Sequence, residues 1–112
     1  MKIELRQLAF SRSGDKGEDS NVMVAPYDER DFDWLCEQLT VDVVADRFGS
    51  VVRGPITRYE LPGSKILNFV MERALEGGVS RSLALDAHGK SRASLILTVT
   101  FESTSPPPSL RV

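Results

Sequence analysis

A glycine-rich segment near the N-terminus holds the residues best suited to bind a ligand, Ser13-Gly14-Asp15-Lys16-Gly17. Glycines let the backbone adopt conformations closed to other residues and let a ligand approach the main chain closely. Successive N–H groups in such a turn can form a concave anion site, to which Lys16 and Arg12 add positive charge. Asp15 could orient Lys16, act as a general base or hold a metal. We therefore expect an anion-binding loop that extends to Asn21.

The same segment also fits a plain structural role. A tight polar turn with a surface ion pair between Asp15 and Lys16 would contribute under about 1 kcal/mol. The spacing is not that of a Walker motif, so we predict no nucleotide site.

A second segment of similar character is Asp86-Ala87-His88-Gly89-Lys90, which contains the one histidine of the chain. Because histidine titrates near neutral pH, His88 is the best single candidate for proton transfer. The alternative is a hairpin turn, since such turns often carry Asp, Gly and Lys for geometry and solubility alone. If both segments lie at one end of a sheet, Asp86, His88 and Lys90 join the first segment in a shared site.

Metal and cofactor sites are not indicated. A single cysteine and a single histidine cannot supply a structural zinc site. Cys36 falls on the apolar stripe of an expected helix, so we interpret it as a small core residue rather than a nucleophile. With one cysteine no intrachain disulfide can form, which fits a reducing compartment. The sequence predicts no bound cofactor.

Composition and charge indicate a soluble globular protein that binds neither nucleic acid nor membrane. Apolar residues make up 41% and charged residues 27%, and 14 basic side chains against 16 acidic ones give a net charge of −2. A nucleic-acid binder would normally show a basic excess. No apolar run approaches the roughly 20 residues of a membrane span. The charged start Met1–Arg6 does not resemble a signal peptide, so we predict a cytoplasmic location.

Periodicity of apolar residues and turn signals predict the elements that position these segments. We expect a loop over 11–21 and a disordered, proline-rich tail over 103–112. The expected elements are a strand over 3–10 with a bulge near Arg6-Gln7, a strand over 22–25, two helices with stripes 32–39 and 41–48, a strand over 56–61, a helix over 64–76 and a hairpin over 83–101.

This order of elements predicts an α+β fold, with helices packed on one face of a mainly antiparallel sheet. A ferredoxin-like sandwich is the natural candidate. We expect one domain over 1–102, followed by the tail over 103–112.

Two aromatic residues fall outside the apolar stripes of their expected helices. Phe69 falls with the charged residues of its expected helix, and Trp34 lies off the stripe of its own. Two such aromatic residues predict contact with another chain, either in a homo-oligomer or with a larger partner. The alternative is that a loop or the tail covers them.

Several motifs in a fixed order resemble the AtuA-like family, named for the acyclic terpene utilisation protein A. The resemblance is to the small ferredoxin-fold domain found at the C-terminal end of such proteins or as a separate chain. The resemblance spans the sequence except for the tail. One departure is Glu18-Asp19-Ser20, which makes the first segment more acidic than an anion-binding site favours. The motifs are Arg12–Gly17 with Asn21, Arg58–Pro62, Leu67–Val70, Gly77–Val79 with Ser82-Leu83, and Leu85–Lys90.

The resemblance implies an accessory role in the breakdown of terpenoid or other branched acyl compounds, with coenzyme A thioesters as possible ligands. The expected partner is a larger AtuA-type protein that carries the main domain, which this chain lacks. Two alternatives stay open. One is a small lyase or hydratase that uses Asp15, Lys16 and His88 as acid–base groups, and the other is a purely structural oligomerisation module.

Overall fold

The structure, a computed structural model, describes residues 2–16, 19–49, 52, 54–72, 90–102 and 104–110, with the backbone alone at 15, 16 and 90–92. Its elements in chain order are β1 (Lys2–Glu4), η1 (Leu5–Gln7), β2 (Ala9–Lys16), β3 (Asp19–Pro26), η2 (Glu29–Asp31), α1 (Phe32–Gln38), α2 (Val41–Phe48), β4 (Ile56–Leu61), β5 (Ile66–Met71), α4 (Lys90–Ile96), β6 (Thr100–Glu102) and η4 (Pro108–Leu110).

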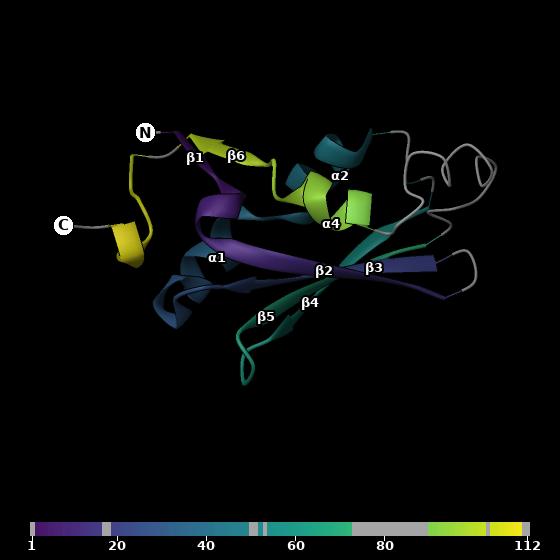
Figure 1. The fold of residues 1–112 in the computed structure, drawn as a ribbon, viewed down its shortest axis with the longest axis horizontal. Helices are drawn as coiled ribbons and strands as arrows, with labels where there is room; N and C mark the ends of the chain where they lie inside the picture. The colour runs from purple at the N-terminus through teal and green to yellow at the C-terminus, as the bar shows by residue number, and fades with distance from the viewer. Residues whose placement is uncertain are drawn as a thin grey trace.

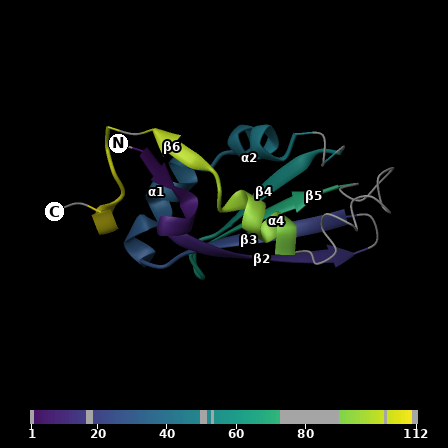
Figure 2. The same ribbon diagram turned by 45° about the horizontal axis from the view of Figure 1, so that its top comes forward.

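A four-stranded sheet in the order β2-β3-β5-β4 forms the frame of the domain, and every neighbouring pair in it is antiparallel. A second, two-stranded antiparallel sheet joins β1 to β6. The helices α1, α2 and α4 all lie on the same side of the larger sheet (Figures 1 and 2). The predicted α+β fold, with helices on one face of an antiparallel sheet, is confirmed.

The hydrophobic core lies between this face of the sheet and the helices. Side chains alternate between the two faces of a strand, so every second residue of β3 and β5 enters the core. The helices contribute their apolar stripes from the other side. The fully buried core residues of these two layers include Val22, Val24, Leu67, Phe69 and Met71 from the sheet and Leu35, Val44 and Ile96 from the helices.

Both short helices, α1 and α2, form where the apolar stripes predict them. Thr40 caps α2 as expected, because its hydroxyl accepts a hydrogen bond from the Val43 N–H at 3.2 Å. Gly49 ends α2 with a positive φ of 57°, a conformation that glycine adopts without strain.

The first strand is interrupted by a turn rather than by a bulge. The apolar alternation changes parity near Arg6-Gln7, and at that point the 3-10 turn η1 separates β1 from β2. The Leu5 N–H donates to the Val99 carbonyl at 2.8 Å and the Arg6 N–H to the Leu97 carbonyl at 3.1 Å. The two halves therefore belong to different sheets, and the predicted continuous strand over 3–10 is wrong.

The predicted loop over 11–21 is also wrong, because most of it belongs to a β-hairpin. Strands β2 and β3 pair over eight residues each, from Ala9 opposite Pro26 to Lys16 opposite Asp19. Polar residues lie on both faces of this hairpin. Arg12 and Asn21 lie on the face open to solvent, and on the other face the Ser11 and Ser20 hydroxyls donate to the carbonyls of Ala93 and Gly14.

The predicted helix over 64–76 is, in its described part, a strand. After a turn over 62–65, in which Lys65 has a φ of 58°, β5 runs antiparallel to β4. The apolar residues of β5 lie on both faces, which gives a run that also fits a helical stripe. Phe69 does not fit that stripe, but it fits the alternation of Leu67 and Met71.

The predicted hairpin over 83–101 differs from the structure in its described part. Residues 90–96 form helix α4, and the strand β6 that follows pairs with β1 at the other end of the domain. Val99 and Phe101 are buried and keep the alternation that the sequence shows. Leu83, Leu85 and the expected turn lie outside the described residues.

The segment expected as a disordered tail is ordered from 104 to 110. The Trp34 Nε1–H donates to the Ser105 carbonyl at 2.7 Å, and the Ser109 N–H donates to the Asp31 carboxylate at 2.9 Å. Pro107 is buried beneath this connection. Three prolines restrict the unfolded chain, which lowers the entropy cost of holding the segment against α1 and η2.

Candidate functional site

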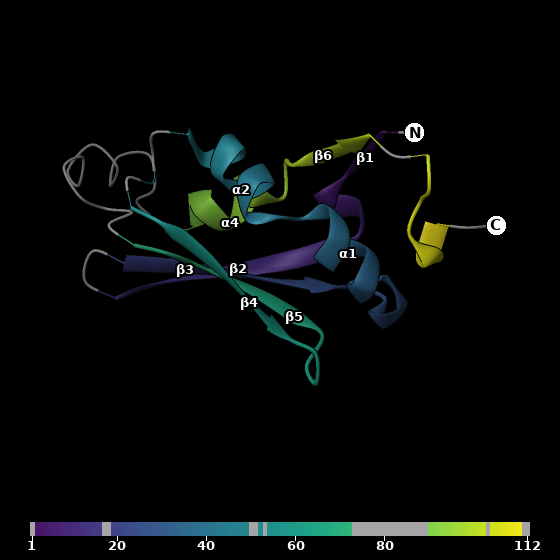
Figure 3. The same ribbon diagram turned by 180° about the vertical axis from the view of Figure 1, so that it is seen from behind.

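The face of the four-stranded sheet that points away from the helices carries no helix among the described residues (Figure 3). Large apolar side chains lie exposed on it: Phe10 of β2 is 43% exposed, and Tyr59 and Leu61 of β4 are 52% and 42% exposed. Tyr27, just after β3, packs its ring 5.7 Å from the ring of Phe10. We call this surface the open face.

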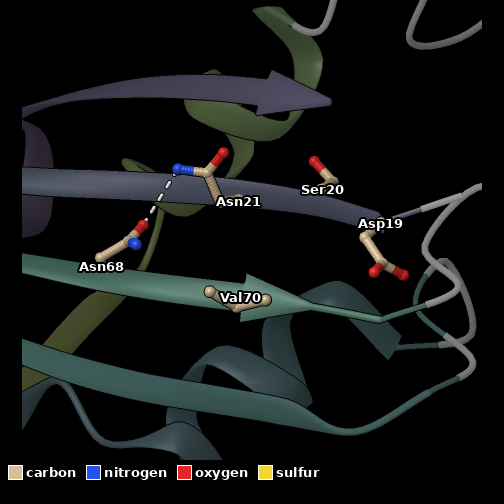
Figure 4. A pocket seen from close by; sticks show the side chains of 5 residues that line it. All are labelled: Asp19, Ser20, Asn21, Asn68 and Val70. Atoms are coloured by element: carbon tan, nitrogen blue, oxygen red, sulfur yellow. Dashed lines mark hydrogen bonds between the residues drawn. The ribbon is translucent and has the colours of Figure 1, made fainter. Parts of the chain in front are cut away.

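A pair of carboxamides lies over the two central strands of the open face. Asn21 of β3 donates from Nδ2 to Oδ1 of Asn68 on β5 at 3.0 Å (Figure 4). Gly14 of β2 lies opposite Asn21 in the register, and a Cβ at residue 14 would come within 2.9 Å of Asn21 Oδ1. Glycine at this position therefore gives the Asn21 side chain room to lie flat across the sheet.

The carboxamides line a polar hollow at one end of the open face. The hollow measures about 400 Å³ and opens widely to solvent. Figure 4 shows the Asp19 carboxylate at the start of β3, beyond Asn21. Ser20 belongs to the opposite face, where its hydroxyl donates to the Gly14 carbonyl at 3.0 Å. The lining residues are Asp19, Ser20, Asn21, Asn68 and Val70.

A second, apolar hollow adjoins the first. It measures about 240 Å³, and its lining residues are Phe10, Arg12, Met23, Ala25 and Ile66. The register pairs Met23 of the apolar hollow with Asn68 of the polar hollow. The two hollows therefore form one strip along the open face, polar at one end and apolar at the other.

Arg12 is the charged residue of the apolar hollow. It is exposed on β2, and no ion pair links it to another residue of the described part of the chain. The guanidinium groups of Arg6, Arg30 and Arg58, by contrast, lie 3.3, 2.7 and 2.8 Å from carboxylates. Arg12 is thus a cation next to an apolar surface, an arrangement suited to a carboxylate with a hydrocarbon chain.

The predicted anion-binding loop has a different local structure. Arg12, Ser13, Gly14, Asp15 and Lys16 all belong to strand β2, and Gly14 does not have a positive φ. An extended, paired strand cannot form the concave row of N–H groups that the sequence suggested. The hairpin turn itself falls at Gly17 and Glu18, outside the described residues. Asn21 does belong to the candidate site, through its side chain.

The second predicted segment lies mostly outside the described residues, including Asp86 and His88. Lys90 is the first residue of α4. This helix packs against β2, where the Ser11 hydroxyl donates to the Ala93 carbonyl at 2.6 Å. The chain that follows the second segment is therefore held next to the strand that contains the first.

Trp34 and Phe69 do not form an exposed interface. Phe69 is 0% exposed on β5, and Trp34 is 7% exposed. The rings of Trp34 and Phe101 pack edge to face, with their centroids 5.2 Å apart. The Trp34 Nε1–H donates a hydrogen bond to the Ser105 carbonyl. The prediction of contact with another chain is wrong for this pair because the 104–110 segment covers Trp34 and the strand buries Phe69.

The one thiol of the chain, Cys36, lies on α1, on the side of the sheet away from the open face. Cys36 is half-buried against the core, and burial, together with the nearby charge of Glu60, raises the pKa of its thiol. No three His, Cys, Asp or Glu side chains of the described residues are grouped so that they could hold a metal ion.

Sequence reasoning missed Asn68, Asp19, Phe10 and Tyr59 as surface or site residues. The available signal was the alternation of Ile66, Asn68 and Val70, which places an amide between two apolar residues on one face. That signal becomes visible only once the segment is treated as a strand instead of a helix.

Comparison with known protein families identifies the family of this chain. In the described part of the chain, none of the helices has the length and apolar character needed to cross a membrane. No curated protein and no solved structure matches the sequence. The family model of the AtuA ferredoxin-like domain matches residues 3–102 of this 112-residue chain. The chain therefore belongs to the AtuA ferredoxin-like domain family.

Proposed function

We propose that this domain is an accessory binding module that holds a branched acyl compound for a larger AtuA-type protein. The ligand is a branched carboxylic acid or its thioester, of the kind met in terpenoid breakdown. The chemical step belongs to the larger protein.

Arg12 beside the apolar hollow is the observation that carries this proposal. A branched hydrocarbon chain would bury apolar area against Met23, Ala25 and Ile66, at roughly 25 cal/mol per Å². The planar guanidinium of Arg12 can form two parallel hydrogen bonds to the carboxylate of a free acid, or donate to the single carbonyl oxygen of a thioester. None of the ion pairs between described residues involves Arg12, so none of those ion pairs must break before it binds an anion.

The polar hollow suits the remainder of a larger ligand. Asn21 and Asn68 are joined by one hydrogen bond, which leaves an acceptor oxygen on Asn21 and an N–H donor on Asn68 without a partner in the described structure. A ligand that continues past its acyl group, such as the amide-containing arm of a coenzyme A thioester, would meet both groups.

The described residues favour binding over catalysis. Cys36, the one thiol, has a raised pKa and is therefore protonated at neutral pH. The carboxylate of buried Asp31 accepts a hydrogen bond from the Ser109 N–H, which gives it a structural role. The side chains of Asp15 and Lys16, and His88 as a whole, lie outside the described structure, so their acid–base role stays a prediction. We assign the reaction to the partner.

Calorimetric titration with branched short-chain carboxylates tests the ligand class. Arg12→Ala should weaken binding by roughly 10- to 100-fold, the loss expected for a charge-assisted hydrogen bond. Arg6→Ala is the matched control, because Arg6 is also exposed but lies on η1, away from both hollows. Equal affinities for wild type and Arg12→Ala, or no binding by wild type, would overturn the proposal.

Reconstitution tests the accessory role. The larger AtuA-type protein encoded nearest to this chain should turn over its acyl substrate faster when the domain is added, and Arg12→Ala should lose that stimulation. A larger protein that is fully active without the domain contradicts the role.

A further inference from the structure

We propose that the open face binds a second copy of this chain, sheet against sheet, around a two-fold axis near Asn21 and Asn68. This inference concerns the state of the domain without ligand and is independent of the proposed function.

The open face has the size and character of a protein interface. Four strands about 4.8 Å apart and six to eight residues long, at about 3.3 Å per residue, present a footprint of roughly 400–500 Å² before side-chain relief is counted. Standard interfaces bury about 800 Å² of accessible surface per partner. The accessible area of the open face is larger than its flat footprint because side chains project from it, which brings it towards this value. Aromatic residues are enriched in interfaces, and Phe10, Tyr27 and Tyr59 are exposed here.

The carboxamide pair at the centre of the open face determines which kind of partner can cover it. Strands β3 and β5 are the two inner strands, so Asn21 and Asn68 lie near the middle of the surface. Covering them with apolar atoms would leave the spare acceptor of Asn21 and the spare donor of Asn68 unpaired, which is costly. A partner on this face must therefore supply one donor and one acceptor in matching positions.

A second copy supplies both groups. In a two-fold interface, residue i meets residue j and residue j meets residue i. If the axis passes between the carboxamides, Asn68 of each copy donates to Asn21 of the other, which makes two equivalent hydrogen bonds. A pair of carboxamides joined by one internal bond is self-complementary whichever of the two donates.

Charge on the open face also permits self-association. The charged side chains that line the two hollows are Arg12 on β2 and Asp19 on β3, one of each sign, so two copies meet without net repulsion from these two groups. Facing sheets pack about 10 Å apart. Both hollows, which are open in the single chain, would then be enclosed between the sheets.

Light scattering on the full chain across a dilution series tests the inference. Wild type should show twice the 12.4 kDa mass of one chain. Tyr59→Glu should be monomeric and folded, because Tyr59 is half exposed in the single chain. Ala45→Glu, on the exposed side of α2, should remain dimeric. Asn68→Ala should raise the dimer dissociation constant by about tenfold or more.

Cross-linking checks the face directly. In a Cys36→Ser background, a short bis-maleimide should couple two copies of Val70→Cys, which lies beside Asn21 in the register, but not two copies of Ala45→Cys. A monomeric wild type, including one that binds a larger AtuA-type protein through this face, would overturn the inference. So would a dimer that survives Tyr59→Glu.

Discussion

Asp31 and Ser109 lie 78 positions apart in the sequence, yet two hydrogen bonds join them. The Asp31 carboxylate is 1% exposed and accepts from both the N–H and the hydroxyl of Ser109. A second connection, from Trp34 Nε1 to the Ser105 carbonyl, holds the same segment nearer its start. The C-terminal segment is therefore part of the folded domain and completes the surroundings of η2 and α1.

Asp31→Ala should destabilise the domain by about 1–3 kcal/mol, because it leaves the Ser109 donors without their acceptor. We expect the 104–110 segment to detach. Trp34 is the one tryptophan of the chain, so its emission should shift to longer wavelength as the segment leaves. Urea unfolding followed by circular dichroism gives the free energy of unfolding, and fluorescence of the folded protein reports the detachment.

Asp33→Ala is the control for this prediction. Asp33 lies two residues away in the first turn of α1 and is exposed, so only its small interaction with the helix dipole is lost. Equal effects of the two substitutions would mean that the contact with Ser109 contributes nothing.

Gly14→Ala should destabilise the domain by about 1–2 kcal/mol, although alanine is normally the better residue in a strand. The added Cβ would lie 2.9 Å from Asn21 Oδ1, so the Asn21 carboxamide must move and its hydrogen bond to Asn68 is weakened or lost. In an Asn21→Ala background the same substitution meets no carboxamide. It should then be neutral or stabilising, since alanine loses less entropy on folding. A double-mutant cycle of unfolding free energies measures the change of sign.

Gly63→Ala gives the matched control for Gly14→Ala. Gly63 lies in the β4–β5 turn with a φ that other residues adopt, and a Cβ there would meet nothing within 4 Å. Its replacement should leave stability nearly unchanged. If Gly14→Ala has the same effect in both backgrounds, Asn21 does not lie over Gly14.

The fold class and the helices α1 and α2 were predictable from sequence, whereas helix α4 and the open face were not. The stripes of α1 and α2 bury one side against the sheet and leave the other in solvent, so each gives a clean helical period. Strand β5 has apolar residues at Ile66, Leu67 and Val70 because its second face is an exposed apolar surface. That double-sided pattern also fits a helix, and no local signal distinguishes the two.

The contact between Gly14 and Asn21 was not predictable. The sequence places both residues in one expected anion-binding loop, but their contact depends on the register of β2 with β3. The sequence alone places 11–21 in a loop because Ser11, Ser13 and Ser20, on the helix-facing side of the hairpin, are polar as well, so the apolar alternation of a half-buried strand is missing. Asn68 joins them through pairing of β3 with β5, a contact 47 residues away along the chain.

Arg58→Ala should cost roughly 2–3 kcal/mol of stability, because the guanidinium holds the end of α1 against β4. Its Nη1 donates to the Cys36 carbonyl at 2.7 Å and the Leu39 carbonyl at 3.0 Å, and charged donors to such acceptors are the stronger class. Arg58→Lys should lose an intermediate amount, since an ammonium cannot reproduce the fork. Arg6→Ala, which removes a surface ion pair, should change the unfolding free energy little.

Cys36 should be alkylated slowly at neutral pH, and its reaction rate should rise only at a more alkaline pH than for an ordinary thiol. Burial raises the pKa of the Cys36 thiol, and the charge of Glu60 raises it further. Because the thiolate is the reactive form, a raised pKa lowers the reactive fraction at any given pH below it. The pH dependence of the iodoacetamide reaction, measured by mass spectrometry, gives the pKa directly.

Substitution of the neighbouring carboxylates tests whether their charge raises the pKa of Cys36. Glu60→Gln should lower the pKa of Cys36 and speed alkylation at fixed pH, because it removes the larger of the two nearby glutamate contributions. Glu37→Gln should shift the pKa in the same direction by less. Unfolding in urea removes burial as well and should restore the ordinary pKa. A profile in the folded wild type that matches the unfolded one would show that neither burial nor Glu60 acts on this thiol.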